Sequence, residues 1–257
     1  MTASNDLARR VIRIKGGDRE DFLQGLVTND VSGLKNGLVY TALLSPQGKY
    51  LADFFLVPEE CSVLLDCDAD LAPDLIKRLT LYKLRADVQF ENTDIAVSRG
   101  TDAAPEGSFA DPRHPALGWR LYAEGQEAMD GTDWTALRVR HLIPESGTEL
   151  VADDSYILEF GFDRIHGVDF RKGCFVGQEI VARMKHKTEL RKGLVQVHIE
   201  GSAPPGTEIT AGGKLVGRLG SQSGDMALAH LRFDRAKGEM EAGTARLRRA
   251  EVGADLQ

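Results

Sequence analysis

The chain has 257 residues, of which 42% are hydrophobic and 28% charged, and its net charge is −7 at pH 7. This composition is typical of a folded protein with a substantial core. The acidic balance argues against broad contact with nucleic acid, which needs a basic surface, and no stretch approaches the roughly 20 apolar residues of a membrane helix. We therefore expect neither a membrane nor a nucleic-acid partner.

The first ninety residues alternate between expected strands and helices. Strands are expected at 10–14, 40–44, 50–57, 62–65 and 87–90, and helices at 18–26 and 71–84. Asp18 is the expected cap of the first helix, and Ser45-Pro46-Gln47-Gly48 predicts a hairpin turn between the second and third strands. Apolar residues at helical spacing, Leu84 included, mark one face of the second helix. This order predicts an α+β unit close to a split βαβ sheet.

The remaining chain divides into two further parts. Residues 95–98 and 118–122 are expected strands, and residues 132–143 an expected helix whose core side chains are Trp134, Leu137 and Leu142. Many short strands with glycine turns after residue 193 predict a small β-barrel. The predicted fold class is α+β, with parts at 1–92, 93–192 and 193–257, of which the first two can interleave.

Three cysteines and a polar N-terminus without an apolar run predict a cytoplasmic protein with free thiols. Cys61 and Cys67 flank the expected strand 62–65, so both are expected to be shielded from solvent. Their spacing does not suit a compact zinc site, and the six histidines form no metal-binding pattern. We therefore expect no dedicated metal site.

Cys174 stands in the segment Arg171-Lys172-Gly173-Cys174-Phe175-Val176-Gly177-Gln178-Glu179, just ahead of an expected helix start. The positive end of a helix and the nearby cation of Lys172 stabilise a thiolate, which predicts a pKa for Cys174 below its ordinary value. A free cysteine also packs as a small apolar residue, and the local pattern leaves this alternative open.

Three segments carry a resemblance that covers most of the chain. They are Phe22 to Val31 with the following Tyr40 to Leu44 and Gly48, then Lys172 to Glu179 with Ala182-Arg183, and finally Gly213 to Gly217 with Ser221 and Ala227 to Ala229. Together they resemble the folate-binding YgfZ family, relatives of the glycine-cleavage T-protein, an aminomethyltransferase. The resemblance implies a T-protein-like cloverleaf of two α+β units and a C-terminal barrel around a tetrahydrofolate pocket. It also implies maintenance of iron–sulfur enzymes, including one that thiolates transfer RNA.

The resemblance implies which residues form the site. Cys174 and Lys172 are the expected reactive pair, and a reduced folate is expected to contact Asn29, Asp30, Asp53, Gly173, Gln178, Glu179 and Arg183. Alternatives remain for several of them. Asn29 and Asp30 also suit helix caps, Asp53 also suits a turn, and Arg183 also suits an ion pair with Glu179.

Two departures from the T-protein pattern weaken a transfer of its reaction. Ala52 stands where T-proteins have the first of two aspartates, and Phe170 where they have a glutamate. An alanine cannot accept a proton or orient the reacting nitrogen of folate. The leading hypothesis is a monomeric, tetrahydrofolate-binding accessory protein for assembly or repair of iron–sulfur clusters, whose partners are client enzymes or assembly proteins. The alternatives are a folate-dependent aminomethyltransferase and a folate-binding scaffold in which Cys174 only packs.

A local basic cluster follows the expected helix that starts near Gln178. It consists of Lys185, His186, Lys187, Arg191 and Lys192. A solvated helix end suits this cluster, and so does a docking site for nucleic acid or an acidic protein.

Overall fold

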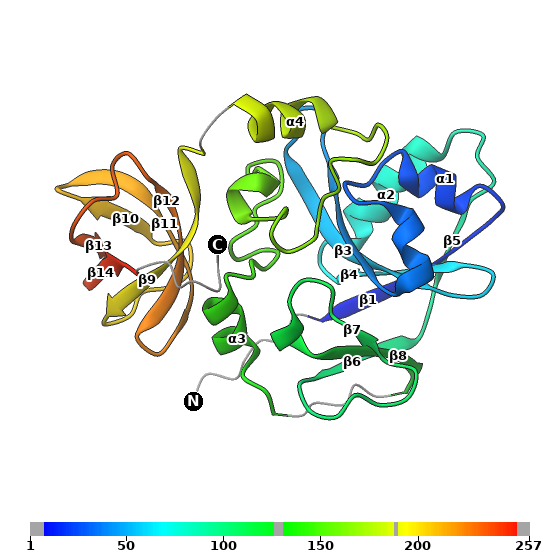
Figure 1. The fold of residues 1–257 in the computed structure, drawn as a ribbon, viewed down its shortest axis with the longest axis horizontal. Coiled ribbons are helices and arrows are strands. Elements are labelled where there is room, and N and C mark those ends of the chain that lie inside the picture. The colour runs from blue at the N-terminus through cyan, green and yellow to red at the C-terminus, as the bar shows by residue number, and fades with distance from the viewer. Residues whose placement is uncertain (1–7, 126–130, 188–189, 251–257) are drawn as a thin grey trace. The chain divides into compact units, whose positions relative to one another are not determined.

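The computed structural model describes residues 8–125, 131–187 and 190–250 (Figure 1). The described chain forms two compact units. Unit 2 comprises 8–125, 131–132 and 163–180, and unit 1 comprises 133–162, 181–187 and 190–250. This division differs from the three parts 1–92, 93–192 and 193–257, which stay a prediction.

The main sheet of unit 2 has five strands in the order β2-β3-β4-β1-β5, and all neighbours are antiparallel. The strands are β1 (Arg9–Lys15), β2 (Val39–Leu44), β3 (Tyr50–Pro58), β4 (Val63–Asp68) and β5 (Gln89–Asn92). The helices α1 (Arg19–Gln24) and α2 (Ala72–Lys83) accompany them. Because β1 lies between β4 and β5, the elements β4, α2 and β5 form a split βαβ unit.

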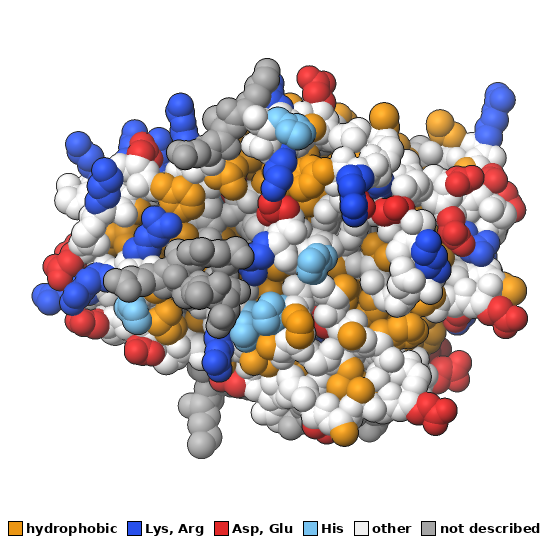
Figure 2. Space-filling model, viewed as in Figure 1, with side chains coloured by type: hydrophobic (Ala, Val, Ile, Leu, Met, Phe, Trp, Pro, Cys, Tyr) orange, Lys and Arg blue, Asp and Glu red, His pale blue; other side chains and the backbone are white. Residues whose placement is uncertain are grey.

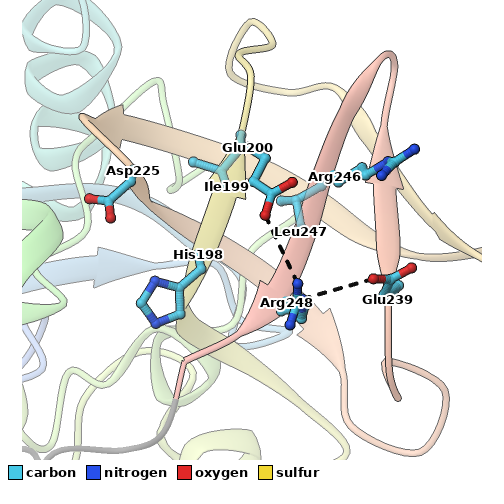
Figure 3. A pocket seen from close by; sticks show the side chains of 8 residues that line it. All are labelled: His198, Ile199, Glu200, Asp225, Glu239, Arg246, Leu247 and Arg248. Carbon is cyan, nitrogen blue, oxygen red and sulfur yellow. Dashed lines mark ion pairs between the residues drawn. The ribbon is translucent and has the colours of Figure 1, made fainter.

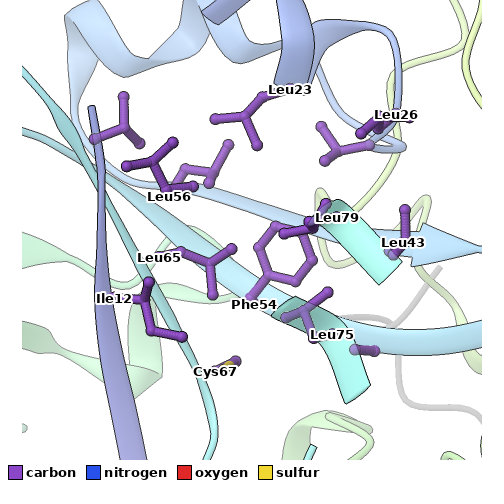
Figure 4. Close-up of a cluster of buried hydrophobic side chains, with 14 of the residues drawn as sticks. Ile12, Leu23, Leu26, Leu43, Phe54, Leu56, Leu65, Cys67, Leu75 and Leu79 are labelled. Atoms are coloured by element: carbon purple, nitrogen blue, oxygen red, sulfur yellow. The ribbon is translucent and has the colours of Figure 1, made fainter. Parts of the chain in front are cut away.

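One face of this sheet forms the core of unit 2 (Figure 4). Phe54 and Leu65 from the sheet and Leu75 and Leu79 from α2 are buried there together. Side chains alternate along a strand, so Ala52 and Phe54 face this core while Asp53 faces the opposite side. The core also contains Cys67, and burial raises the pKa of its thiol to about 12.

Local sequence signals predict the β2–β3 hairpin correctly. The Gly48 N–H donates to the carbonyl of Ser45 at 2.8 Å, and Gly48 has a φ of +73°. Asp18 is the N-cap residue of α1, as predicted, and its carbonyl accepts the Phe22 N–H at 2.9 Å. Its side chain makes no cap hydrogen bond and instead accepts one from the Asp87 N–H at 2.8 Å. Leu84 does not belong to the apolar face of α2, since the helix ends at Lys83 and Leu84 is 89% exposed.

A second sheet of unit 2 has the order β6-β8-β7. Its strands are β6 (Ile95–Gly100), β7 (Phe109–Ala110) and β8 (Trp119–Glu124). Two 3-10 helices, η1 (Val31–Asn36) and η2 (Pro115–Leu117), complete this unit. Through the described ranges, every helix is too short or too polar to cross a membrane.

Unit 1 contains a closed barrel in the order β10-β11-β12-β9-β14-β13, which confirms the barrel predicted from sequence. Its strands are β9 (Lys192–Glu200), β10 (Glu208–Ala211), β11 (Lys214–Ser223), β12 (Met226–Arg232), β13 (Met240–Ala242) and β14 (Ala245–Arg249). Val195, Val197 and Ile199 alternate with more exposed residues along β9 and are buried inside the barrel.

Unit 1 also contains α3 (Trp134–His141) and η3 (Ile157–Phe160), while α4 (Gln178–Lys187) begins in unit 2 and ends in unit 1. The sequence predicted Leu137 and Leu142 as core side chains of α3, but both are only partly buried and Arg138 is buried instead. Its Nη2 donates to the Ser221 hydroxyl at 2.9 Å, and Glu149 lies 3.3 Å from its Nη1. A buried ion pair with hydrogen bonds therefore ties α3 to β11.

Candidate functional site

Cys174 lies in an irregular segment of unit 2, residues 171–177, which leads into α4; we call it the cysteine loop. The Cys174 side chain is exposed, and so is Gly173, around which a Cβ atom would meet open space. The thiol is therefore accessible to a reagent or a partner. Cys61 is also exposed, which corrects the prediction that Cys174 alone is accessible; only Cys67 is buried.

Lys172 anchors the cysteine loop. Its side chain is buried, and its Nζ donates to the carbonyls of Gln24, Val27 and Asn29 at 2.8, 2.5 and 3.0 Å. An ammonium group has three N–H donors, so these carbonyls take its full capacity. Burial lowers the pKa of Lys172 to about 8, although Asp30 and Asp169 oppose the shift. The structure thus shows an anchoring role, and the predicted effect on the Cys174 thiolate stays a prediction.

Two glycines let the cysteine loop approach the β2–β3 turn. A Cβ atom on Gly177 would lie 2.7 Å from the carbonyl oxygen of Ser45, and one on Gly48 would lie 2.7 Å from Cβ of Ile180. Such separations are too short for a side chain, and both residues have a positive φ, which favours glycine. Phe175 is buried and Val176 packs against the core of unit 2. The backbone on either side of Cys174 is therefore fixed.

The segment Thr28-Asn29-Asp30 is hydrogen-bonded to residues 166–167, which precede the cysteine loop. The buried Thr28 hydroxyl donates to the Gly167 carbonyl at 2.7 Å. Asn29 Nδ2 donates to the carbonyls of Tyr40 and His166 at 2.8 and 2.7 Å. Asp30 accepts the Ser32 N–H at 3.0 Å and caps η1, and this bond lowers the pKa of Asp30. The capping alternative is thus observed for Asp30.

Asn29 and Asp30 also line an open pocket of about 370 Å³ within unit 2, which we call the Asn29 pocket. Two carboxylates, a lysine, a histidine and a tyrosine contribute to its wall. The lining residues are Asn29, Asp30, Ser32, Gly33, Lys35, Asn36, Leu38, Val39, Tyr40, Pro112, His166 and Asp169. The structure therefore brings two of the predicted folate-binding residues to one pocket.

Asp53 lies elsewhere, buried between two tyrosines. The hydroxyl groups of Tyr40 and Tyr50 donate to its two carboxylate oxygens at 2.9 and 2.6 Å. Burial and the neighbouring Asp53 carboxylate raise the pKa of Tyr40 well above its ordinary value. Asp53 is not among the residues that line the Asn29 pocket. In the structure Asp53 is thus bound by two buried tyrosine hydroxyl groups. It neither stabilises a turn nor faces the open pocket.

Ala52 and Phe170, the two departures from the T-protein pattern, lie in different surroundings. Ala52 faces the apolar core of unit 2, where a carboxylate would be buried without a partner. The apolar core thus explains an alanine at this position, and its identity says little about a ligand site. Phe170 is 36% exposed, and its neighbour Asp169 accepts the Arg171 N–H at 2.6 Å.

The predicted site residues of α4 lie at or beyond the end of the cysteine loop. Gln178 Nε2 donates to the Gly173 carbonyl at 3.5 Å, a long hydrogen bond across the helix start. Glu179 and Arg183 are exposed, as are Lys185 and His186 of the basic cluster. Arg191, just before β9, and Lys192, its first residue, are also exposed, and the Lys187 side chain lies outside the described residues. The structure groups Gly173, Cys174 and Gln178 and leaves Glu179 and Arg183 in solvent.

A buried ion network in unit 2 was missed by the sequence analysis. Asp66 on β4 accepts hydrogen bonds from Arg9 and Arg120, while Asp111 pairs with Arg113 at 2.8 Å and with Arg120 at 3.6 Å. Although burial opposes it, the two guanidinium groups lower the pKa of Asp66. The Arg113 guanidinium also lies 5.4 Å from the Tyr40 ring centroid. The sequence did contain one sign of this network, because charged residues such as Asp66 stand inside otherwise apolar strands. A charged side chain is almost never fully buried unless it is paired with an opposite charge.

The barrel has its own pocket, of about 320 Å³, lined by His198, Ile199, Glu200, Asp225, Glu239, Arg246, Leu247 and Arg248 (Figure 3). Arg248 lies between Glu200 and Glu239, with ion-pair distances of 3.9 and 4.0 Å. On the face shown in Figure 2, lysine and arginine side chains gather over the barrel strands. The acidic and basic groups of this pocket partly compensate one another, and no sequence motif singled it out.

Comparisons with known proteins place these features in context. Residues 191–252 match the family described as CAF17, C-terminal beta-barrel domain. The chain is 33% identical over 231 residues to the mitochondrial iron–sulfur cluster assembly factor IBA57 homolog of Mycosarcoma maydis, covering 77% of this chain and 57% of that protein. It is 31% identical to mitochondrial IBA57 of Mus musculus and 30% identical to that of Homo sapiens. These matches cover 92% and 90% of this chain and 79% and 78% of the relatives.

A solved structure shows the same fold. It is the glycine cleavage system aminomethyltransferase T from Bartonella henselae, which matches with a TM-score of 0.72 over 95% of this chain and 83% of that chain. At 13% sequence identity this likeness concerns the fold alone, and it confirms the predicted T-protein-like architecture. The prediction of a cytoplasmic location is wrong, because the three relatives named above are mitochondrial proteins.

Proposed function

The chain belongs to the family of IBA57 iron–sulfur cluster assembly factors, and on that premise we propose that it acts in the assembly or repair of iron–sulfur clusters, with Cys174 as its reactive thiolate. The chain spans little more than half, 57%, of the Mycosarcoma maydis relative, so the proposal concerns the part of the activity that this length carries. The observation that supports it best is an exposed cysteine on a loop whose backbone is fixed on both sides.

A fixed loop suits an exposed thiolate that must be presented to another molecule. Lys172 and Phe175 flank Cys174 and are both buried, whereas Gly173 and Cys174 are exposed. The loop therefore loses little conformational entropy when the thiolate binds its target. A Cβ atom on Gly173, the residue ahead of the cysteine, would meet open space, so this part of the loop is open to an approaching partner.

One thiolate cannot hold an iron–sulfur cluster by itself, because such clusters typically have four protein thiolate ligands. Within the described ranges, no group of three or more His, Cys, Asp and Glu side chains is placed to hold a metal ion. In our proposal the chain supplies one ligand, Cys174, which releases its proton to solvent when it binds iron. Glutathione, a second subunit, or an assembly or client protein supplies the others.

A reduced folate is the proposed ligand of the Asn29 pocket. The chemistry of the lining suits it: the carboxylates of Asp30 and Asp169 accept the N–H groups of a pterin edge, and Lys35 attracts the carboxylates of the glutamate tail. The volume of about 370 Å³ lies near the lower end of the range for small-molecule sites. When bound, tetrahydrofolate carries one-carbon units. Calorimetry with tetrahydrofolate, with Lys35→Met and Asp169→Asn as weakened variants, tests this assignment; equal heats for all three proteins would reject the pocket.

The proposed clients are enzymes that carry iron–sulfur clusters. The YgfZ resemblance implies that they include an enzyme that thiolates transfer RNA. Aminomethyl transfer stays the alternative function. Because Phe170 cannot replace the glutamate that T-proteins have at this position, the purified protein is expected to release no ammonia above background from an aminomethyl-loaded lipoyl carrier. Robust folate-dependent turnover would restore that alternative.

Complementation tests the central proposal. A strain that lacks its own factor is supplied with wild type, Cys174→Ser or Cys61→Ser, and the activities of iron–sulfur enzymes are measured. Cys61 is the matched control because it is also exposed but lies outside the loop. We expect loss of activity with Cys174→Ser alone, at unchanged protein level and folate affinity. Full activity of Cys174→Ser would show that the thiol is not needed.

A further inference from the structure

The C-terminal end of α2 exposes an apolar surface that the fold does not use. Leu75 and Leu79 of this helix are buried in the core of unit 2. Two to five residues after Leu79, Leu81 is 71% exposed, Tyr82 39% and Leu84 89%. Large apolar side chains in solvent lower the solubility of a protein, and a group of three within four residues forms a candidate contact surface. We call Leu81, Tyr82 and Leu84, with the basic residues around them, the α2-end surface.

The charge around these side chains has the opposite sign to that of the chain. Between Asp74 and Asp87 the sequence carries four basic residues and no acidic one, whereas the net charge of the whole chain is −7. The basic residues are Lys77, Arg78, Lys83 and Arg85, of which Lys77, Arg78 and Arg85 are exposed. An exposed apolar centre with a basic rim is complementary to an acidic, amphipathic partner.

The backbone of Leu84 gives independent support. This residue has a φ of +47°, a conformation that favours glycine and disfavours leucine. Its side chain is almost fully exposed and so contributes no packing within the described structure. A glycine would suit the fold at least as well, because it would remove both the strain and the exposed apolar area. The leucine is explained if its side chain is buried by another molecule.

We propose that the α2-end surface docks an acidic amphipathic segment of a partner protein. A short segment interacts mainly with the local basic rim, because charges more than about 8 Å away are screened at physiological ionic strength. An anionic membrane or a nucleic acid covers a much larger area and would meet the repulsion of the chain's net negative charge. The inference goes beyond the proposed function and does not depend on Cys174.

The test compares two double variants of the full chain. Leu84→Gly with Arg85→Glu changes the surface, and Lys214→Glu with Leu215→Ser is the control, since it makes the same charge change and removes a leucine that is 49% exposed on the barrel. The probe is a fluorescent synthetic helix with leucine on one face and glutamate on the other, followed by anisotropy. We expect the surface variant to bind at least tenfold more weakly than wild type, and the control to bind like wild type.

Two further measurements complete the test. Thermal unfolding of Leu84→Gly alone is expected to give a Tm equal to or above that of wild type, which separates docking from folding. Binding of phosphatidylglycerol vesicles and of transfer RNA is measured with the same proteins. Equal peptide affinities for the surface and control variants would overturn the proposal. A surface variant that loses vesicle or RNA binding while keeping its peptide affinity would overturn it as well.

Discussion

Lys172 and Val27 are 145 residues apart in the sequence, yet Nζ of Lys172 lies 2.5 Å from the carbonyl oxygen of Val27. Two further carbonyls share the same ammonium group, so one side chain closes the cysteine loop onto the segment that follows α1. The loop that carries the exposed thiol is therefore held by the side chain of a residue two positions ahead of the cysteine.

Replacing this lysine should destabilise the protein. In Lys172→Met the carbonyls of Gln24, Val27 and Asn29 lose their shared donor, and unpaired buried polar groups each cost about 1–3 kcal/mol. We expect the free energy of unfolding to fall by about 2–4 kcal/mol in urea denaturation. The exposed Lys214→Met should change it by less than about 0.5 kcal/mol. Equal effects of the two substitutions would contradict an anchoring role.

Stability should also depend on pH through the same residue. The pKa of Lys172 is lowered to about 8, below its unfolded value, so between these two values the unfolded chain binds the extra proton. Wild-type stability relative to Lys172→Met should therefore be constant below the folded pKa. It should then rise by up to about 1.4 kcal/mol per pH unit until the unfolded lysine titrates near pH 10.4. Denaturation at several pH values checks this. A relative stability that stays constant over this window and falls only above about pH 10.4 would mean that the carbonyls hold the ammonium charged.

The three cysteines should differ in their rate of alkylation. Cys174 is exposed just ahead of the start of α4, and we expect it to react fastest with iodoacetamide near neutral pH because a helix N-terminus favours a thiolate. Cys61 is exposed and should follow. Cys67 is buried, with its pKa raised to about 12, and should react only on unfolding. Mass spectrometry after limited labelling measures the order; a Cys61 rate equal to that of Cys174 would remove the case for an activated thiol.

Gly48 should tolerate no side chain, and Gly107 provides the matched control. Both have a similar positive φ, +73° and +78°, but a Cβ atom on Gly48 would lie 2.7 Å from Ile180 Cβ, whereas one on Gly107 would have no atom within 4 Å. Gly107→Ala should therefore cost only the backbone strain, about 1 kcal/mol. Gly48→Ala should cost about 2–4 kcal/mol because it adds overpacking. If Gly48→Ala and Gly107→Ala lowered the free energy of unfolding by similar amounts in urea denaturation, the turn at Gly48 would be able to move away from α4 without cost.

The buried ion network should matter far more than a surface ion pair. Arg120 pairs with Asp66 at 2.8 Å with side chains 3% and 0% exposed, whereas Arg13 pairs with Glu59 at 2.7 Å with side chains 29% and 31% exposed. We expect Arg120→Met to lower the free energy of unfolding by about 3–5 kcal/mol, since it leaves a buried carboxylate undercompensated. Arg13→Met should lower it by about 1 kcal/mol or less. The ratio of the two losses is the measured quantity, and a ratio near one would contradict the prediction.

Features with local causes were predictable from the sequence. The Pro46–Gly48 turn depends on adjacent residues, and the barrel strands show the alternation that buries Val195 and Val197. Their physical determinants lie within a few residues along the chain, where a sequence pattern can show them.

Features with remote causes were not predictable. The carbonyl partners of Lys172 and the pairing of Arg120 with Asp66 join residues 54 or more positions apart, so no local pattern records them. The helical spacing of apolar residues continues to Leu84, but Leu79 is the last of them that is buried in the core. Helical periodicity does not show where the sheet that covers the helix ends. Cys61 was misplaced for a similar reason: it precedes a buried strand but belongs to the exposed turn before it.

The interrupted course of the chain bears on how the protein is made on the ribosome. Residues 163–180 belong to unit 2, but residues 133–162, which belong to unit 1, precede them in the chain. A nascent chain that has emerged only as far as β8 lacks Lys172, so the carbonyls of Gln24, Val27 and Asn29 have no ammonium group to bind. Completion of unit 2 therefore waits until residue 172 has been synthesised, and a premature stop codon before this position removes Cys174 together with the lysine that holds its loop in place.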